Sequence, residues 1–303
     1  MSVVEELLRL GGVATRSALI AATSRPEVDA ALRTGEVTRL ARGRYALPQA
    51  DEARSRAHAL TGVMCLLSAA LHHGWAVKHP PDRPQVALPR NRKVPSDVVG
   101  SVEIRRLRLA PDDVVDGATS KDRTLLDCLR ALPFDEALAV ADSALRDGYP
   151  HKRLEAVARD ARGPDSVRAR RVARVATALA ANPFESVLRA IAMTVAGLSV
   201  RPQVSLYRRN DSVVGGRTFL GRPDLVDEQL RIVLEADSFE WHGGRTALRS
   251  DALRYNGLVV DGWLVLRFTW EDVMFDSSAV RVMLERAVAE RTDQLCAVCG
   301  AAS

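Results

Sequence analysis

The stretch GRPDLVDEQLRIVLEADSFEWH, from Gly221 to His242, contains two apolar runs separated by a polar turn, a pattern typical of a β-hairpin. Three carboxylates, Asp224, Glu235 and Asp237, interrupt these runs. Carboxylates are rarely buried without a partner. Their presence in strands that should form a core therefore indicates a shared polar site.

The strand pattern predicts where these carboxylates lie. Side chains alternate along a strand, so Glu235 and Asp237 share one face. If the turn is centred between Gln229 and Leu230, Asp224 lies directly across from Glu235. Three carboxylates placed so closely repel one another, and a divalent cation would neutralise them. Because oxygen ligands suit Mg²⁺ or Mn²⁺, we predict a metal site at Asp224, Glu235 and Asp237.

The segments around the hairpin follow the order helix, three strands, helix, strand, helix. They lie at residues 182–197, 199–207, 215–227, 230–237, 246–262, 263–270 and 277–291. This order resembles the αβββαβ core of the restriction-endonuclease-like nucleases, which implies that fold class for residues 182–292. Glu185 on the first helix would add a carboxylate, and Gln203 on the first strand would orient water or phosphate. His242 would act as an acid, base or ligand at neutral pH.

Plainer interpretations remain open for several of these residues. Glu185 is also consistent with a position facing water on its helix, and His242 with an ordinary loop histidine. Asp251 and Arg254 lie three residues apart in the next helix, a spacing that predicts an ion pair within that helix.

The stretch RPDLVDEQLRIVLEAD resembles the PD-(D/E)-x-K nuclease motif, with Pro223-Asp224 followed by Glu235. Residues 182–292 more closely resemble an uncharacterised family allied to very-short-patch-repair endonucleases. The resemblance implies a metal-dependent DNA endonuclease fold. By position, Asp224 and Glu235 correspond to metal ligands, and Glu185 to the helix carboxylate.

The sequence departs from that motif at Asp237, which stands where a lysine is usual. An ionised aspartate has neither a proton nor a positive charge to offer. Three outcomes are open: Asp237 binds a second metal, or His242, Arg245 or Arg249 compensates, or cleavage is lost. In addition, Ser238 stands where the family has glycine.

The N-terminal residues 1–48 contain three short helical patterns, at 3–10, 15–23 and 26–35, followed by an alternating segment at 36–48. Thr15 is the expected cap of the second helix, and Gly35 the expected end of the third. Three helices and a hairpin predict a winged helix-turn-helix. GGVATRSALIAA…VTRLARGRYALP resembles the winged helix of AbiEi-type antitoxins, which are transcriptional regulators, and the resemblance extends to about residue 160.

In such a module the third helix enters the major groove, and phosphate contacts position it. The candidate DNA-binding residues, on this helix and on the hairpin, are Arg25, Arg33, Arg39, Arg42 and Arg44. They are equally consistent with a solvated surface. Their clustering favours nucleic acid. Glu27 and Asp29 on the same helix count against it.

The remaining chain divides into an α/β middle region at 49–160, an Arg-rich linker helix at 161–181 and a tail at 293–303. Within the middle region, residues 57–76 predict one apolar helix ending in His72-His73. Adjacent helical residues point about 100° apart, so these two rings are not expected to share an ion. Cys296 and Cys299 supply half of a zinc site, with a frayed tail as the alternative.

The expected fold class is thus multidomain α+β and α/β: a winged helix, a helical α/β middle region and a restriction-endonuclease-like domain. Apolar residues make up 47% of the chain, but no run is long enough to span a bilayer, which predicts a cytoplasmic protein without membrane contact. Two functions remain: a metal-dependent DNA endonuclease, or an antitoxin-like regulator whose nuclease-like domain does not cleave. DNA is the partner in both, and a homodimer and a cognate toxin are left open.

Overall fold

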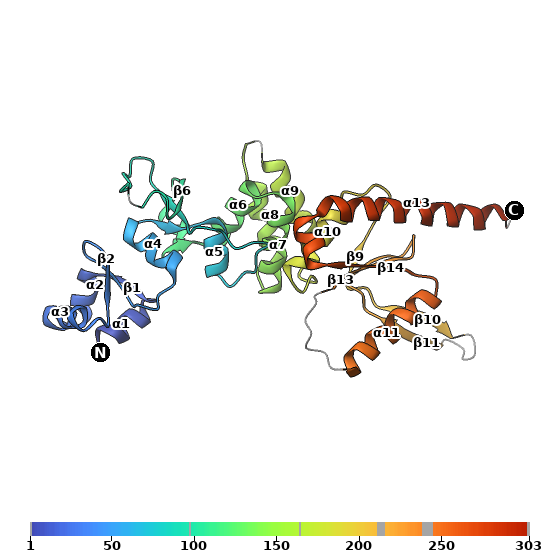
Figure 1. Ribbon diagram of the computed structural model, residues 1–303. Coiled ribbons are helices and arrows are strands. Elements are labelled where there is room, and N and C mark those ends of the chain that lie inside the picture. The colour runs from blue at the N-terminus through green and yellow to red at the C-terminus, as the bar shows by residue number, and fades with distance from the viewer. Residues whose placement is uncertain (1, 97, 164, 211–215, 238–244, 302–303) are drawn as a thin grey trace. The chain divides into compact units, whose positions relative to one another are not determined.

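The computed structural model describes residues 2–96, 98–163, 165–210, 216–237 and 245–301 (Figure 1). Helices and several small sheets alternate along this part of the chain, as expected for a multidomain α+β protein. The chain divides into two compact units. Unit 1 comprises Met1–Ala131 and Leu154–Ala169, and unit 2 comprises Leu132–Arg153 and Arg170–Ser303.

Unit 1 begins with three helices, α1 (Val3–Arg9), α2 (Arg16–Ala22) and α3 (Arg25–Thr34). They pack against a three-stranded antiparallel sheet in the order β1-β3-β2, formed by β1 (Val13–Thr15), β2 (Thr38–Ala41) and β3 (Arg44–Ala46). The expected caps are confirmed. The Thr15 hydroxyl accepts from the Ala18 N–H, and Gly35 ends α3 in the left-handed conformation.

The prediction of one helix over residues 57–76 is wrong. The structure has α4 (Glu52–Leu60), β4 (Val63–Met64) and α5 (Leu66–His72). Gly62 explains the break, because a Cβ there would lie 2.5 Å from Cγ1 of Val86 and 3.0 Å from the carbonyl oxygen of Ala87. Only glycine lets the backbone approach the neighbouring strand so closely.

Through this break β4 joins a five-stranded sheet in the order β6-β5-β4-β8-β7. Its other strands are β5 (Gln85–Leu88), β6 (Glu103–Arg106), β7 (Val114–Val115) and β8 (Ala118–Thr119), and a 3₁₀ turn at Pro111–Asp113 precedes β7. The following helices are α6 (Lys121–Ala131), α7 (Phe134–Arg146), α8 (His151–Asp160) and α9 (Ser166–Val175). The Arg-rich helix α9 is shorter than the predicted 161–181.

Unit 2 is built on a four-stranded sheet in the order β14-β13-β12-β9. Its strands are β9 (Arg201–Pro202), β12 (Leu225–Asp227), β13 (Ile232–Asp237) and β14 (Leu264–Thr269), with β13 and β14 parallel. One face, including Leu225, Ile232 and Leu234, packs against α10 (Pro183–Ala192), α12 (Trp270–Phe275) and α13 (Ser277–Ala301). Helix α10 ends at Ala192, before the predicted residue 197, because the chain turns there.

The opposite face of that sheet carries Val226 and Val233, which pack with Leu258 of α11 (Arg245–Val260). A separate two-stranded ribbon, β10 (Leu206–Asn210) and β11 (Gly216–Gly221), lies on this side, next to α11 (Figure 1). The predicted single strand over 215–227 is wrong, because β11 and β12 belong to different sheets. Pro223 lies in the break, where it has no N–H for a strand ladder.

The predicted tail at 293–303 is also wrong as far as the structure describes it, since α13 continues to Ala301. Cys296 is exposed on this helix, and the side chain of Cys299 lies outside the described part. Among the described residues, no helix has the length and apolar character that crossing a membrane requires.

Candidate functional site

The predicted register of the β12–β13 hairpin is confirmed. Leu225 pairs with Leu234 and Asp227 with Ile232, so the register, continued by one residue, places Asp224 opposite Glu235. The backbone N–H of Ala236 donates to Oδ2 of Asp224 at 2.9 Å, which fixes this carboxylate beside β13.

Gln203, just after β9, connects two carboxylates. Its Nε2 donates to Oδ1 of Asp224 at 3.2 Å and to Oε2 of Glu185 at 3.4 Å. Its backbone N–H donates to the carbonyl oxygen of Asp224 at 2.9 Å. Gln203 has φ +55°, a left-handed conformation that non-glycine residues seldom adopt. The amide therefore gathers Glu185 and Asp224 beside Glu235.

Glu185 is placed by the start of α10. Asn182 caps the helix by accepting from the Glu185 N–H at 3.0 Å, and Oε2 of Glu185 accepts from the Ala181 N–H at 2.9 Å. The side chain is buried, so the interpretation that it faces water is wrong. Burial raises the pKa of Glu185, and the Asp224 carboxylate raises it further, while the Ala181 N–H opposes this rise.

Glu235 is also buried, and sequence reasoning missed its main partner, Arg254 of α11. Arg254 Nη1 donates to Oε1 of Glu235 at 2.9 Å, whereas its contact with Asp251, the predicted pair, is longer at 3.7 Å. Burial, followed by the charge of Asp224, raises the pKa of Glu235 to about 7, against the opposing effect of Arg254. The sequence did contain a signal for this contact. Helix α11 connects the parallel strands β13 and β14, so it must lie over one face of β13 and can bring Arg254 close to Glu235.

Asp237 at the end of β13 contacts a second arginine. Its Oδ2 accepts from Nη2 of Arg267, on the parallel strand β14, at 2.5 Å. The ring of Tyr255 contacts both cations, with its centre 4.6 Å from the Arg254 guanidinium carbon and 4.2 Å from that of Arg267. Burial and the charge of Glu235 raise the pKa of Tyr255 to about 12, so its hydroxyl stays protonated. Two cations therefore border the carboxylates.

The other predicted site residues contribute less. His242 and Ser238 lie outside the described residues, as does the side chain of Arg245. Arg249 is exposed on α11. Among the described residues, no group of three or more histidine, cysteine or acidic side chains already has the arrangement of a metal site.

The predicted DNA-binding arginines of unit 1 are mostly exposed. The exposed ones are Arg25, Arg33, Arg39 and Arg42. Arg44 differs, because it is half-buried with Nη1 3.4 Å from Nδ1 of His58, and burial lowers its pKa. Asp29 is paired with Arg16 at 2.5 Å, and Glu27 accepts from the Ser24 hydroxyl. Both acids that counted against DNA binding thus have partners within the module.

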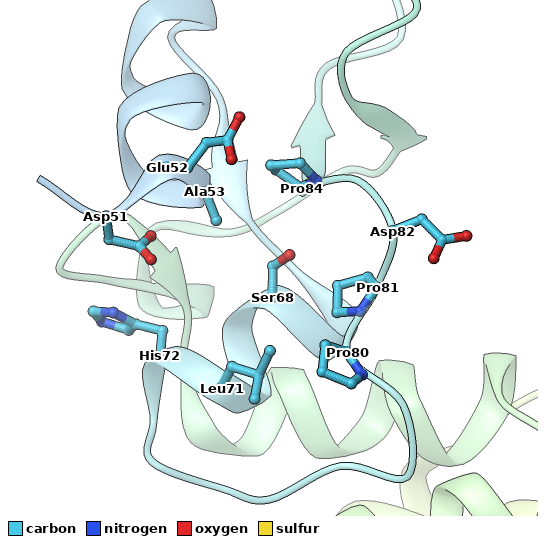
Figure 2. Close-up of a pocket in the computed structure, with 10 residues that line it drawn as sticks. All are labelled: Asp51, Glu52, Ala53, Ser68, Leu71, His72, Pro80, Pro81, Asp82 and Pro84. Carbon is cyan, nitrogen blue, oxygen red and sulfur yellow. The ribbon is translucent and has the colours of Figure 1, made fainter.

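Unit 1 also contains a pocket of about 440 Å³. It is lined by Asp51, Glu52, Ala53, Ser68, Leu71, His72, Pro80, Pro81, Asp82 and Pro84 (Figure 2). His72 borders this pocket, whereas Nε2 of His73 lies 2.8 Å from the carbonyl oxygen of Thr119. The two rings therefore face different surroundings, as predicted for adjacent helical residues.

Comparison with known proteins gives little further information. No protein-family model matches this chain, and no curated protein sequence matches it. Among solved structures, the RV2827C protein from Mycobacterium tuberculosis matches with a TM-score of 0.32 and 18% sequence identity. That match covers 61% of this chain and 78% of the other.

Proposed function

We propose that this chain is a DNA-binding protein whose residues 182–292 form a metal-dependent DNA endonuclease of the restriction-endonuclease-like class. The observation that carries the proposal is that Glu185 and Asp224 converge on the amide of Gln203, with Glu235 opposite Asp224 in the hairpin register. Buried carboxylates placed together are unfavourable unless a cation or proton joins them.

The residues present fit a hard divalent cation. Asp224 and Glu235 would hold Mg²⁺ or Mn²⁺ through oxygen, with Glu185 as a nearby carboxylate. Burial first, and then the charge of Asp224, raise the pKa of Glu235, so a cation at this site would favour its ionised form. When bound, the ion would activate water and stabilise charge on the phosphodiester. Asp237 was predicted to be a metal ligand, but we now assign it the role of orienting Arg267, with which it is hydrogen-bonded.

We infer that Arg254 supplies the positive charge that a lysine supplies in the usual motif. Its guanidinium carries a permanent positive charge and already contacts the carboxylate of Glu235. A guanidinium offers several N–H donors in a plane, a geometry that suits the oxygens of a phosphate. We therefore assign Arg254 to the scissile phosphate, with Tyr255 holding the guanidinium plane by stacking.

Site selection is assigned to residues 1–48 as a winged helix-turn-helix. Its support is the order of three helices and a hairpin, with the exposed Arg25 and Arg33 on α3 and the exposed Arg42 between β2 and β3. Helix α3 would read the major groove, and the arginines would contact phosphates.

Cleavage of plasmid and linear DNA by the full chain with Mg²⁺ or Mn²⁺ tests the enzyme assignment. Asp224→Asn and Glu235→Gln should each reduce cleavage by about a hundredfold or more, since supporting contacts of metal sites alone are worth about 10- to 100-fold. Glu290→Gln, an exposed acid on α13, is the matched control and should cleave normally. Undiminished cleavage by the Asp224 and Glu235 variants would refute the assignment.

The second candidate is an antitoxin-like transcriptional regulator that binds DNA without cutting it. It is favoured by the ion pairs Glu235–Arg254 and Asp237–Arg267, which neutralise two carboxylates without metal. The regulator predicts salt-sensitive binding to its own promoter that survives Asp224→Asn and Glu235→Gln. Metal-dependent cleavage abolished by those same substitutions would exclude a purely regulatory role.

A further inference from the structure

The β10–β11 ribbon of unit 2 carries two exposed aromatic rings. Tyr207 and Phe219 are directly paired across the two strands, and their ring centres lie 5.5 Å apart with an edge-to-face geometry. Tyr207 is 51% exposed and Phe219 58% exposed. A contiguous pair of exposed aromatic rings is a candidate contact surface for another molecule.

The other face of the ribbon is used for folding. Leu206 is buried and packs, together with Leu220, in the core cluster that contains Leu258 of α11. Arg208 Nε donates to Oδ1 of Asp261 at 2.9 Å. The ladder shifts register between Leu206 and Tyr207, and beyond this shift the exposed rings of Tyr207 and Phe219 lie outside the core that Leu206 and Leu220 join.

The outward face also carries positive charge. Arg217 is exposed and lies two residues from Phe219 on β11, so it shares the aromatic face. Two aromatic rings beside the guanidinium of Arg217 fit a partner with flat ring faces and a negative backbone, which is the chemistry of nucleic acid.

We propose that Tyr207 and Phe219 form a base-stacking surface for DNA whose bases are unpaired. In a regular duplex the faces of the bases are covered by their neighbours, and only base edges and backbone are accessible. Aromatic side chains bind base faces, so they favour a strand in which stacking is already broken. The proposal rests on the proposed function only in taking DNA as the partner.

Fluorescence anisotropy of labelled oligonucleotides with the full chain tests the proposal, in EDTA so that cleavage plays no part. Tyr207→Ser and Phe219→Ser should each weaken binding to a duplex with a central unpaired bubble by about fivefold or more, as expected for loss of one stacked base. Binding to the fully paired duplex should change much less. A 2-aminopurine base in the bubble should be quenched by the native chain and less by the variants.

Val282→Ser is the matched control, because Val282 is a similarly exposed apolar residue on α13 of the same unit. It should bind both DNAs as the native chain does.

Equal effects of the aromatic substitutions on both DNAs, or no effect, would overturn the stacking surface even if cleavage is found. A lower oligomeric state of the Tyr207 and Phe219 variants would instead mean that a second copy covers the rings. Failure of the native chain to bind any DNA would overturn both proposals, whereas stacking without metal-dependent cleavage would overturn only the endonuclease.

Discussion

Asp237 on β13 and Arg267 on β14 form a hydrogen-bonded ion pair across the two parallel strands. This pair and the Glu235–Arg254 pair identify the cations that accompany the carboxylates, so the net charge of the site can be calculated. Four carboxylates, those of Glu185, Asp224, Glu235 and Asp237, are accompanied by two arginines, Arg254 and Arg267. When all four acids are ionised, a net charge of two negative units remains, which one divalent cation would balance.

Breaking the Arg254–Glu235 pair should destabilise unit 2. In Arg254→Met, Glu235 stays buried without its cation, and we expect a loss of about 1.5–3 kcal/mol of unfolding free energy, the range for hydrogen bonds to charged groups. Urea unfolding would measure it. The double variant Arg254→Met/Glu235→Gln should recover part of this loss. If the two single effects simply add, the pair is not coupled.

The raised pKa of Glu235 predicts a pH dependence of stability. Between pH 4.5, its ordinary pKa, and about pH 7, its folded pKa, the folded chain holds a proton that the unfolded chain has released. Metal-free stability should therefore fall as the pH rises through this window. Glu235→Gln has no such proton to lose. The difference in unfolding free energy between this variant and the native chain should therefore shift in favour of the variant as the pH rises from 4.5 to about 7. Parallel stability curves for the two proteins would contradict the prediction.

Gly62 should not tolerate a side chain. In Gly62→Ala the new methyl group would meet Val86, Leu88 and the Ala87 carbonyl oxygen at 3.0 Å or less, so β4 must shift away from β5. We expect unit 1 to lose about 1–3 kcal/mol, measurable by calorimetry. Gly100→Ala is the control, since a Cβ there meets nothing within 4 Å. Equal melting temperatures for the two variants would argue against the close approach.

The winged-helix proposal predicts a phosphate contact by Arg33. Arg33→Gln should weaken DNA binding across different sequences and reduce the slope of log affinity against log salt by about 1. Binding measured over a range of salt concentrations gives this slope. Arg286→Gln, an exposed arginine on α13, should leave the slope unchanged. If Arg33→Gln and Arg286→Gln change the slope equally, Arg33 makes no specific contact with a phosphate.

Local patterns predicted the centre of the site better than its surroundings. The hairpin register followed from side-chain alternation and one turn, which are properties of about twenty neighbouring residues. The Arg254–Glu235 contact joins residues 19 positions apart through a crossover helix, so spacing alone favoured the local pair with Asp251. The strand break before β12 and the continuation of α13 were missed because each depends on which sheet or core the chain joins.

Gly221 connects two parts of unit 2 that have been described separately. A Cβ at this position would lie 3.2 Å from Cδ and 3.3 Å from Cγ of Arg254. It is also the last residue of β11, three residues before Asp224. The chain therefore leaves the ribbon at the point where the stem of Arg254 passes. A side chain at position 221 would press on this stem, so a substitution at the end of the ribbon would also disturb the guanidinium that contacts Glu235.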